Sequence, residues 1–92
     1  MDNLLARVEQ AQQQIAAVRN PQVRRDLIKM LMTVDRALLN MNKESVECRR
    51  LHKPTARYQA LELETLELID NLEKFLIFAC LLGGWLQTVQ VL

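Results

Sequence analysis

Two stretches of the sequence, on either side of Pro54, carry apolar residues at matching heptad positions. Alternating spacings of three and four residues place these side chains on one face of a helix, as in a coiled-coil seam. If the chain reverses at Pro54-Thr55, the two seams meet in layers whose residue numbers add up to 109. The sequence thus predicts an antiparallel helical hairpin of about residues 21–53 and 55–82. The expected layers are Leu51 with Tyr58, Cys48 with Leu61, Glu44 with Thr65, Met41 with Leu68, Ala37 with Leu72, Val34 with Phe75, Met30 with Ala79, and Leu27 with Leu82.

Charge favours the same pairing of the two helices. Residues 21–53 carry eight basic and four acidic side chains, whereas residues 54–74 carry two basic and five acidic ones. Exposed ion pairs contribute less than about 1 kcal/mol each, so the charges support the pairing but do not determine it.

Further apolar positions predict a third helix that covers the hairpin. Residues 3–19 form a single narrow apolar stripe, and Asn20-Pro21 is a typical helix start that separates this segment from the next. With only two glycines, the chain has too few turn residues for an all-β fold or a phosphate-binding loop. We therefore expect one all-α domain of residues 1–92, a hairpin with a packed N-terminal helix. The positions to be covered are Ile28, Leu31 and Leu38 on the first hairpin helix, and Leu66, Ile69, Leu76 and Cys80 on the second.

Some apolar residues fit neither of these packing faces, and they predict a partner-binding surface or a homo-oligomer. The sequence from Phe75 to Leu92 has no charged residue, and Gly83-Gly84 is expected to end the last helix. A membrane anchor needs about 20 predominantly apolar residues, and the two glycines interrupt this run. Residues 83–92 therefore form an apolar C-terminal tail that packs on this hairpin, on a neighbouring copy or, less favoured, on a membrane. The candidate partner-binding residues are Met32, Leu39, Leu63, Ile77, Trp85 and Leu86.

The sequence offers little for catalysis or metal binding. His52 is the only histidine, so neither Ser45 nor Cys48 has a second histidine to activate it. Cys48 and His52 are spaced as half of a metal site, but structural zinc needs four ligands. We expect no enzymatic activity, no cofactor and no metal.

Basic residues gather around the predicted turn: Arg49, Arg50, Lys53 and Arg57. Such a cluster can contact phosphates. The net charge of the whole chain is only +1, however, so nucleic acid is not the expected partner and the role of the basic turn stays open.

The N-terminus is charged and periodic from its first residues, which is not the pattern of a cleaved signal peptide. Cys48 and Cys80 lie 32 residues apart without a Cys-x-x-Cys element. We therefore expect a cytoplasmic protein.

The segment with Arg57-Tyr58-Gln59, Glu64-Thr65 and the aliphatic-to-aromatic run from Leu68 to Ala79 resembles one helix of a known family. It is similar to the second hairpin helix of the small E-type co-chaperones of bacterial type III secretion needles. The segment from Val23 to Leu39 resembles the first hairpin helix, and the resemblance covers about residues 22–80. It implies a cytoplasmic hairpin that joins a tetratricopeptide-like chaperone and helps keep the needle subunit soluble before export. The resemblance also implies that the unused apolar faces contact the chaperone.

Taken together, these patterns predict a non-enzymatic interaction protein, a co-chaperone or assembly subunit that binds a helical partner through apolar helix faces. A self-assembling structural subunit, whose tail packs on a neighbour, is one alternative. A small membrane-attached protein is another.

Overall fold

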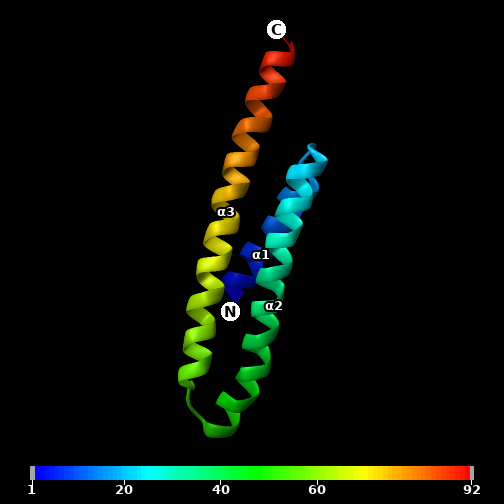
Figure 1. The fold of residues 1–92 in the computed structure, drawn as a ribbon. Coiled ribbons are helices and arrows are strands. Elements are labelled where there is room, and N and C mark those ends of the chain that lie inside the picture. Colours follow the sequence, from blue (N-terminus) through cyan, green and yellow to red (C-terminus); the bar gives the residue numbers. More distant parts are fainter. Residues whose placement is uncertain (1, 92) are drawn as a thin grey trace.

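The computed structural model describes the backbone of residues 2–91 and the side chains of residues 3–79 and 81. It contains three helices, α1 (Asp2–Ala16), α2 (Pro21–Leu51) and α3 (Ala56–Val91). α2 and α3 form the predicted antiparallel hairpin, and α1 lies along it (Figure 1). The described residues include no strand, so the all-α prediction is confirmed. The molecule is a rod of 62 × 17 × 17 Å.

α2 begins as the sequence predicts, at a capped proline. The side-chain oxygen of Asn20 accepts hydrogen bonds from the backbone N–H groups of Gln22 (2.9 Å) and Val23 (3.2 Å). These bonds satisfy donors that the first turn of a helix leaves without a partner. The guanidinium of Arg24 donates to the carbonyl of Val18 at 3.2 Å, which fixes the connection between α1 and α2.

α2 ends in a Schellman motif with a histidine where glycine is usual. The backbone N–H of His52 donates to the carbonyl of Arg49 (3.3 Å), and that of Lys53 donates to the carbonyl of Cys48 (3.1 Å). His52 has φ 58° and ψ 31°, which is the left-handed conformation. Thr55 then caps α3, since its hydroxyl accepts a hydrogen bond from the N–H of Tyr58 at 3.0 Å.

The left-handed backbone at His52 leads to a stability prediction. A non-glycine residue in this conformation costs about 1–2 kcal/mol, which glycine avoids. We expect His52→Gly to raise the free energy of unfolding by about 1 kcal/mol and the melting temperature by about 4–8 °C. Lys53→Gly is the control, because Lys53 has a negative φ and loses stability as glycine. Equal losses of stability in both variants would contradict the left-handed cap.

The core lies between all three helices. The stripe of α1 is buried, so this helix covers the hairpin as predicted. The buried residues are Leu4, Val8, Ala11 and Ile15 of α1, Leu27, Val34, Ala37 and Met41 of α2, and Thr65, Ile69, Leu72 and Leu76 of α3.

One predicted layer, Val34 with Phe75, is wrong. Phe75 is 59% exposed, whereas Leu76 is 1% exposed and Ile69 is fully buried. The reason is that α1 packs on one side of the hairpin, so the most buried line of α3 turns toward α1 and away from Phe75. Ile28, expected beneath α1, is also exposed (41%).

The expected polar layer of Glu44 and Thr65 also differs in the structure. The Thr65 hydroxyl donates to the carbonyl of Leu61 in its own helix (2.7 Å). Glu44 instead accepts a hydrogen bond from the hydroxyl of Thr55 at the turn (2.9 Å).

Leu51, placed in the seam by the sequence, is 40% exposed because α2 ends there.

α3 is longer than predicted. It continues through Gly83 and Gly84 to Val91, so residues 83–91 extend the helix instead of forming a separate tail. Each glycine costs only about 1 kcal/mol relative to alanine in a helix, which the flanking residues can offset. The side chains of Cys80 and Leu82, assigned to packing positions from the sequence, lie outside the described ones.

Candidate interaction surface

Large apolar side chains are exposed on α3 between Phe75 and Leu81. Beyond this stretch the helix extends past the connection between α1 and α2 (Figure 1). Phe75 is 59% exposed, Ile77 62%, Phe78 64% and Leu81 67%. We call these four residues the exposed end of α3. They belong to the stretch of sequence without a charged residue. Contact with another apolar surface would therefore remove apolar area from water without desolvating a charge.

The helix periodicity explains why these residues stay outside the core. Leu72 and Leu76 are the buried residues of this segment. Phe75 lies 100° from Leu76 around the helix, and Phe78 lies about 160° from it. The core can take one line of side chains from α3, and the other apolar residues of the segment remain in solvent.

Four of the six residues predicted to bind a partner have described side chains, and all four are exposed. Met32 (60%) and Leu39 (52%) lie on α2, and Leu63 (65%) and Ile77 (62%) lie on α3. Met32, Leu39 and Leu63 each precede a buried residue by two positions, which turns them about 160° from the core. They face outward on opposite sides of the hairpin and do not form one patch. Trp85 and Leu86 lie outside the described side chains, and the binding role of all six stays a prediction.

Four further exposed apolar residues were not predicted from the sequence to bind a partner: Leu5, Val46, Phe78 and Leu81. Phe75, which is also exposed, was predicted to lie in the core. Phe75 and Leu76 are adjacent and both apolar, and only the position of α1 decides which of them is buried. The spacing of Ile69 and Leu76 was the available signal, because these two residues are one heptad apart.

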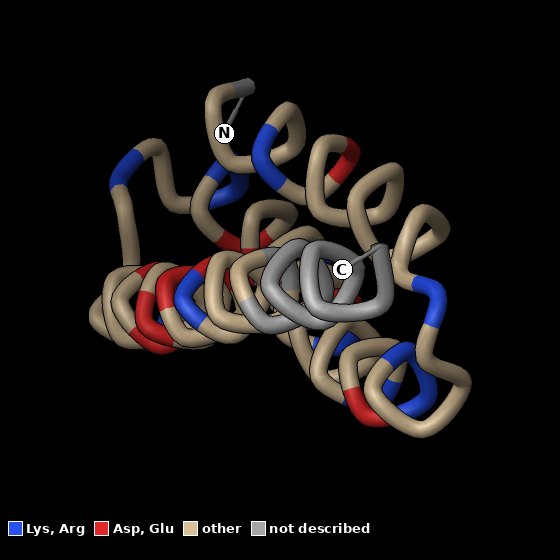
Figure 2. The backbone as a smooth tube through the Cα atoms, turned by 90° about the horizontal axis from the view of Figure 1, so that it is seen from above, with Lys and Arg blue, Asp and Glu red and all other residues tan. Residues whose placement is uncertain are grey.

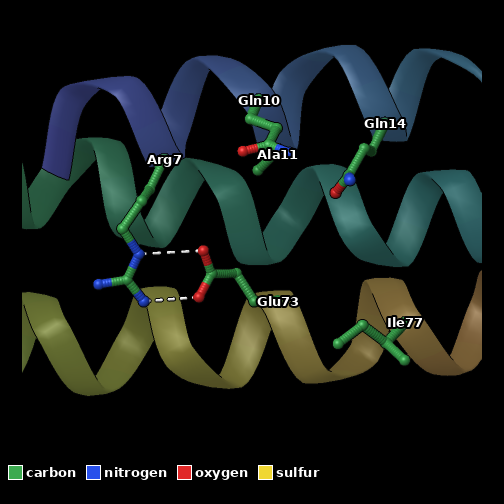
Figure 3. A pocket seen from close by; sticks show the side chains of 6 residues that line it. All are labelled: Arg7, Gln10, Ala11, Gln14, Glu73 and Ile77. Atoms are coloured by element: carbon green, nitrogen blue, oxygen red, sulfur yellow. Dashed lines mark hydrogen bonds and ion pairs between the residues drawn. The ribbon is translucent and has the colours of Figure 1, made fainter. Parts of the chain in front are cut away.

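A shallow groove of about 210 Å³ between α1 and α3 contains an ion-pair cluster. In Figure 3, Arg7 reaches from α1 toward Glu73 of α3. Its Nε donates to Glu73 Oε2 at 3.0 Å, and its Nη2 donates to Glu73 Oε1 at 2.5 Å and to Asp70 Oδ1 at 2.6 Å. Hydrogen bonds from Glu73 and then Asp70 raise the pKa of the Arg7 guanidinium above its usual range. Because two carboxylates already neutralise this guanidinium, the groove attaches α1 to α3 and does not attract an anion.

The basic turn is partly neutralised by acidic neighbours. Arg50 pairs with Glu47, and the hydrogen bonds between them lower the pKa of the Glu47 carboxyl and raise that of Arg50. Arg57 lies 3.8 Å from a carboxylate oxygen of Glu44. These pairs weaken the positive field that phosphate binding would need.

The region around Cys48 is organised by Thr55. The Thr55 backbone N–H donates to Cys48 Sγ at 3.4 Å, and the Thr55 hydroxyl lies 3.7 Å from the same sulfur. Among the described residues, no three His, Cys, Asp or Glu side chains come together as a metal site. Within the same residues, no helix has the length and apolarity needed to cross a bilayer.

No protein-family model matches this sequence, and no curated protein or solved structure is significantly similar to it.

Proposed function

We propose that this protein is a non-enzymatic interaction protein, a co-chaperone or assembly subunit that binds a helical partner through the exposed end of α3. The observation that carries this proposal is the exposure of four large apolar side chains, each between 59% and 67%, on a segment without charge. Several large exposed apolar side chains gathered on one segment are typical of protein-binding sites.

The spacing of these side chains supports docking of a helix. Phe75, Phe78 and Leu81 follow one another at intervals of three residues, so they project from consecutive turns of α3. A helix that docks in an apolar groove uses anchors at such intervals. Full burial of each anchor would contribute about 1.5–3 kcal/mol of apolar transfer free energy.

The resemblance to secretion needle co-chaperones suggests the kind of partner. Residues Tyr58-Gln59 and the run from Leu68 to Ala79 carry this resemblance, and the run includes Phe75 and Phe78. A tetratricopeptide-like chaperone would supply a groove between helices for α3. In this role the protein acts in the cytoplasm and helps keep an export substrate unpolymerised.

Affinity capture from the native cell tests this function with a matched pair of variants. Phe75→Ser/Phe78→Ser removes two exposed anchors, and Leu5→Ser/Leu51→Ser removes two exposed apolar side chains (48% and 40%) at other places. We expect the wild type and the Leu5→Ser/Leu51→Ser variant to retain the same helical protein, identified by mass spectrometry. The Phe75→Ser/Phe78→Ser variant should lose at least nine-tenths of it, since two anchors amount to several kcal/mol. Equal retention of the same proteins by all three chains would overturn the proposal.

A further inference from the structure

α2 carries a second row of side chains on the side that faces away from α3. The row follows spacings of four, three, four, three and four residues, which is again a heptad pattern. All of its members are exposed, and its apolar members are between 41% and 60% exposed. We call it the outer row of α2, and it consists of Ile28, Met32, Asp35, Leu39, Asn42 and Val46.

α3 carries a corresponding row on the side that faces away from α2. It has the same spacing, all six side chains are exposed, and its apolar members are between 62% and 67% exposed. We call it the outer row of α3, and it consists of Leu63, Glu67, Asp70, Lys74, Ile77 and Leu81.

The two outer rows complement each other when they run antiparallel. In the alignment that pairs them best, the residue numbers of each pair add up to 109. Three pairs are then apolar and one joins opposite charges, and only Leu39 with Asp70 is mismatched. The pairs are Ile28 with Leu81, Met32 with Ile77, Asp35 with Lys74, Leu39 with Asp70, Asn42 with Glu67, and Val46 with Leu63.

This alignment is not the register inside the hairpin. The contacts near the turn join Glu44 to Arg57 and Cys48 to Thr55, whose residue numbers add up to 101 and 103. Two copies in the same orientation therefore bring the outer row of α2 against the outer row of α3 when one copy is shifted along the axis of the other. The matched segment from Ile28 to Val46 is about 27 Å long, at a rise of about 1.5 Å per residue.

Charge beside the rows favours the same contact. Five exposed basic residues run beside the outer row of α2 at spacings of four, seven, seven and seven residues, so they form one line. α3 presents Glu67 within its outer row and exposed Glu64 beside it, whereas the carboxylate of Asp70 is already paired with Arg7. In Figure 2 the acidic residues are spread along the helix that ends at the C label. A basic edge facing an acidic edge favours this contact over contacts between like faces. The basic residues are Arg25, Lys29, Arg36, Lys43 and Arg50, of which Arg50 is already paired with Glu47.

We propose that the outer row of α2 binds the outer row of α3 of a second copy of this chain. The two surfaces are different, so the contact is heterologous and can repeat into a ring or an open row of hairpins. Ile77 and Leu81 belong both to this outer row and to the exposed end of α3, whereas Phe75 and Phe78 belong only to the exposed end. Phe75→Ser/Phe78→Ser therefore leaves both outer rows intact.

Mixing two blocked variants tests the proposal on the full chain. Met32→Glu/Leu39→Glu blocks only the outer row of α2, and Leu63→Glu/Ile77→Glu blocks only that of α3. All four positions are more than half exposed, so both variants should keep the wild-type circular dichroism spectrum and melting temperature. The measurement is sedimentation velocity of the wild type, of each variant alone, and of their equimolar mixture.

We expect the wild type to sediment as oligomers and each variant alone as a monomer of 10.7 kDa. The mixture should form a dimer of twice that mass, because each variant supplies the surface that the other lacks. A wild type that stays monomeric, a mixture that stays monomeric, or a single variant that still forms wild-type oligomers would overturn the proposal. Loss of partner capture by Phe75→Ser/Phe78→Ser tests the other proposal and leaves this result unchanged.

Discussion

Leu72→Asp is expected to abolish the cooperative fold of this protein. Leu72 is fully buried between the helices. A carboxylate at this position would lose its water without gaining a hydrogen-bond partner, which costs several kcal/mol. The total stability of a domain is about 5–15 kcal/mol, and a chain of this length is at the low end. We expect the loss of the cooperative thermal transition that circular dichroism follows in the wild type.

The control for this change is Leu63→Asp on the same helix. Leu63 is 65% exposed, so the new carboxylate stays in water and the melting temperature should change by only a few degrees. A Leu72→Asp chain that melts like the Leu63→Asp chain would show that α3 does not turn Leu72 toward the core.

The second large effect is expected at Leu76. Its neighbour Phe75 is the residue that the heptad pattern placed in the core. Leu76 is 1% exposed, and Leu76→Ala removes buried methyl groups and leaves a cavity. Such a change costs about 2–5 kcal/mol, which lowers the melting temperature of a domain of this size by about 10 °C or more. Phe75→Ala should cost less than about 1 kcal/mol, because the ring is mostly in solvent already.

Urea unfolding of the two variants decides between the two registers. The structure predicts a much lower midpoint for Leu76→Ala than for Phe75→Ala, with similar slopes. The reverse order would show that Phe75 packs opposite Val34, as the heptad alone predicts.

The hairpin was predictable because several local signals agree on it. Asn20-Pro21 and Pro54-Thr55 mark both ends of α2, and the caps at Asn20 and Thr55 have the expected chemistry. The narrow stripe of α1 matched the apolar surface left on the hairpin, which identified α1 as the covering helix. Agreement between spacing, caps and charge is what makes a fold predictable from sequence.

The choice between Phe75 and Leu76 was not predictable from the heptad of the hairpin alone. A two-helix seam places Phe75 inside, whereas the third helix shifts the buried line of α3 toward Leu76.

The end of α3 was misplaced for a different reason. Gly83-Gly84 is a common helix stop, but its cost in a helix is small enough for the helix to continue.

The candidate surface was predictable in part. Met32, Leu39, Leu63 and Ile77 fitted neither packing face of the sequence pattern, and their side chains are exposed. Their division between two opposite sides of the hairpin follows from the helix rotation seen in the structure. The ion pairs of Arg7 with Asp70 and Glu73 were not foreseen, because five acidic residues of α3 are equally possible partners until α1 is placed.

The central claim is that the exposed end of α3 serves binding and not folding. The measurement that tests it most directly is the amount of partner captured by Phe75→Ser/Phe78→Ser, made on a preparation whose thermal melt is recorded at the same time. We predict a melting temperature within a few degrees of the wild type together with the loss of at least nine-tenths of the captured partner. A chain that melts normally and captures as much partner as the wild type would contradict the claim.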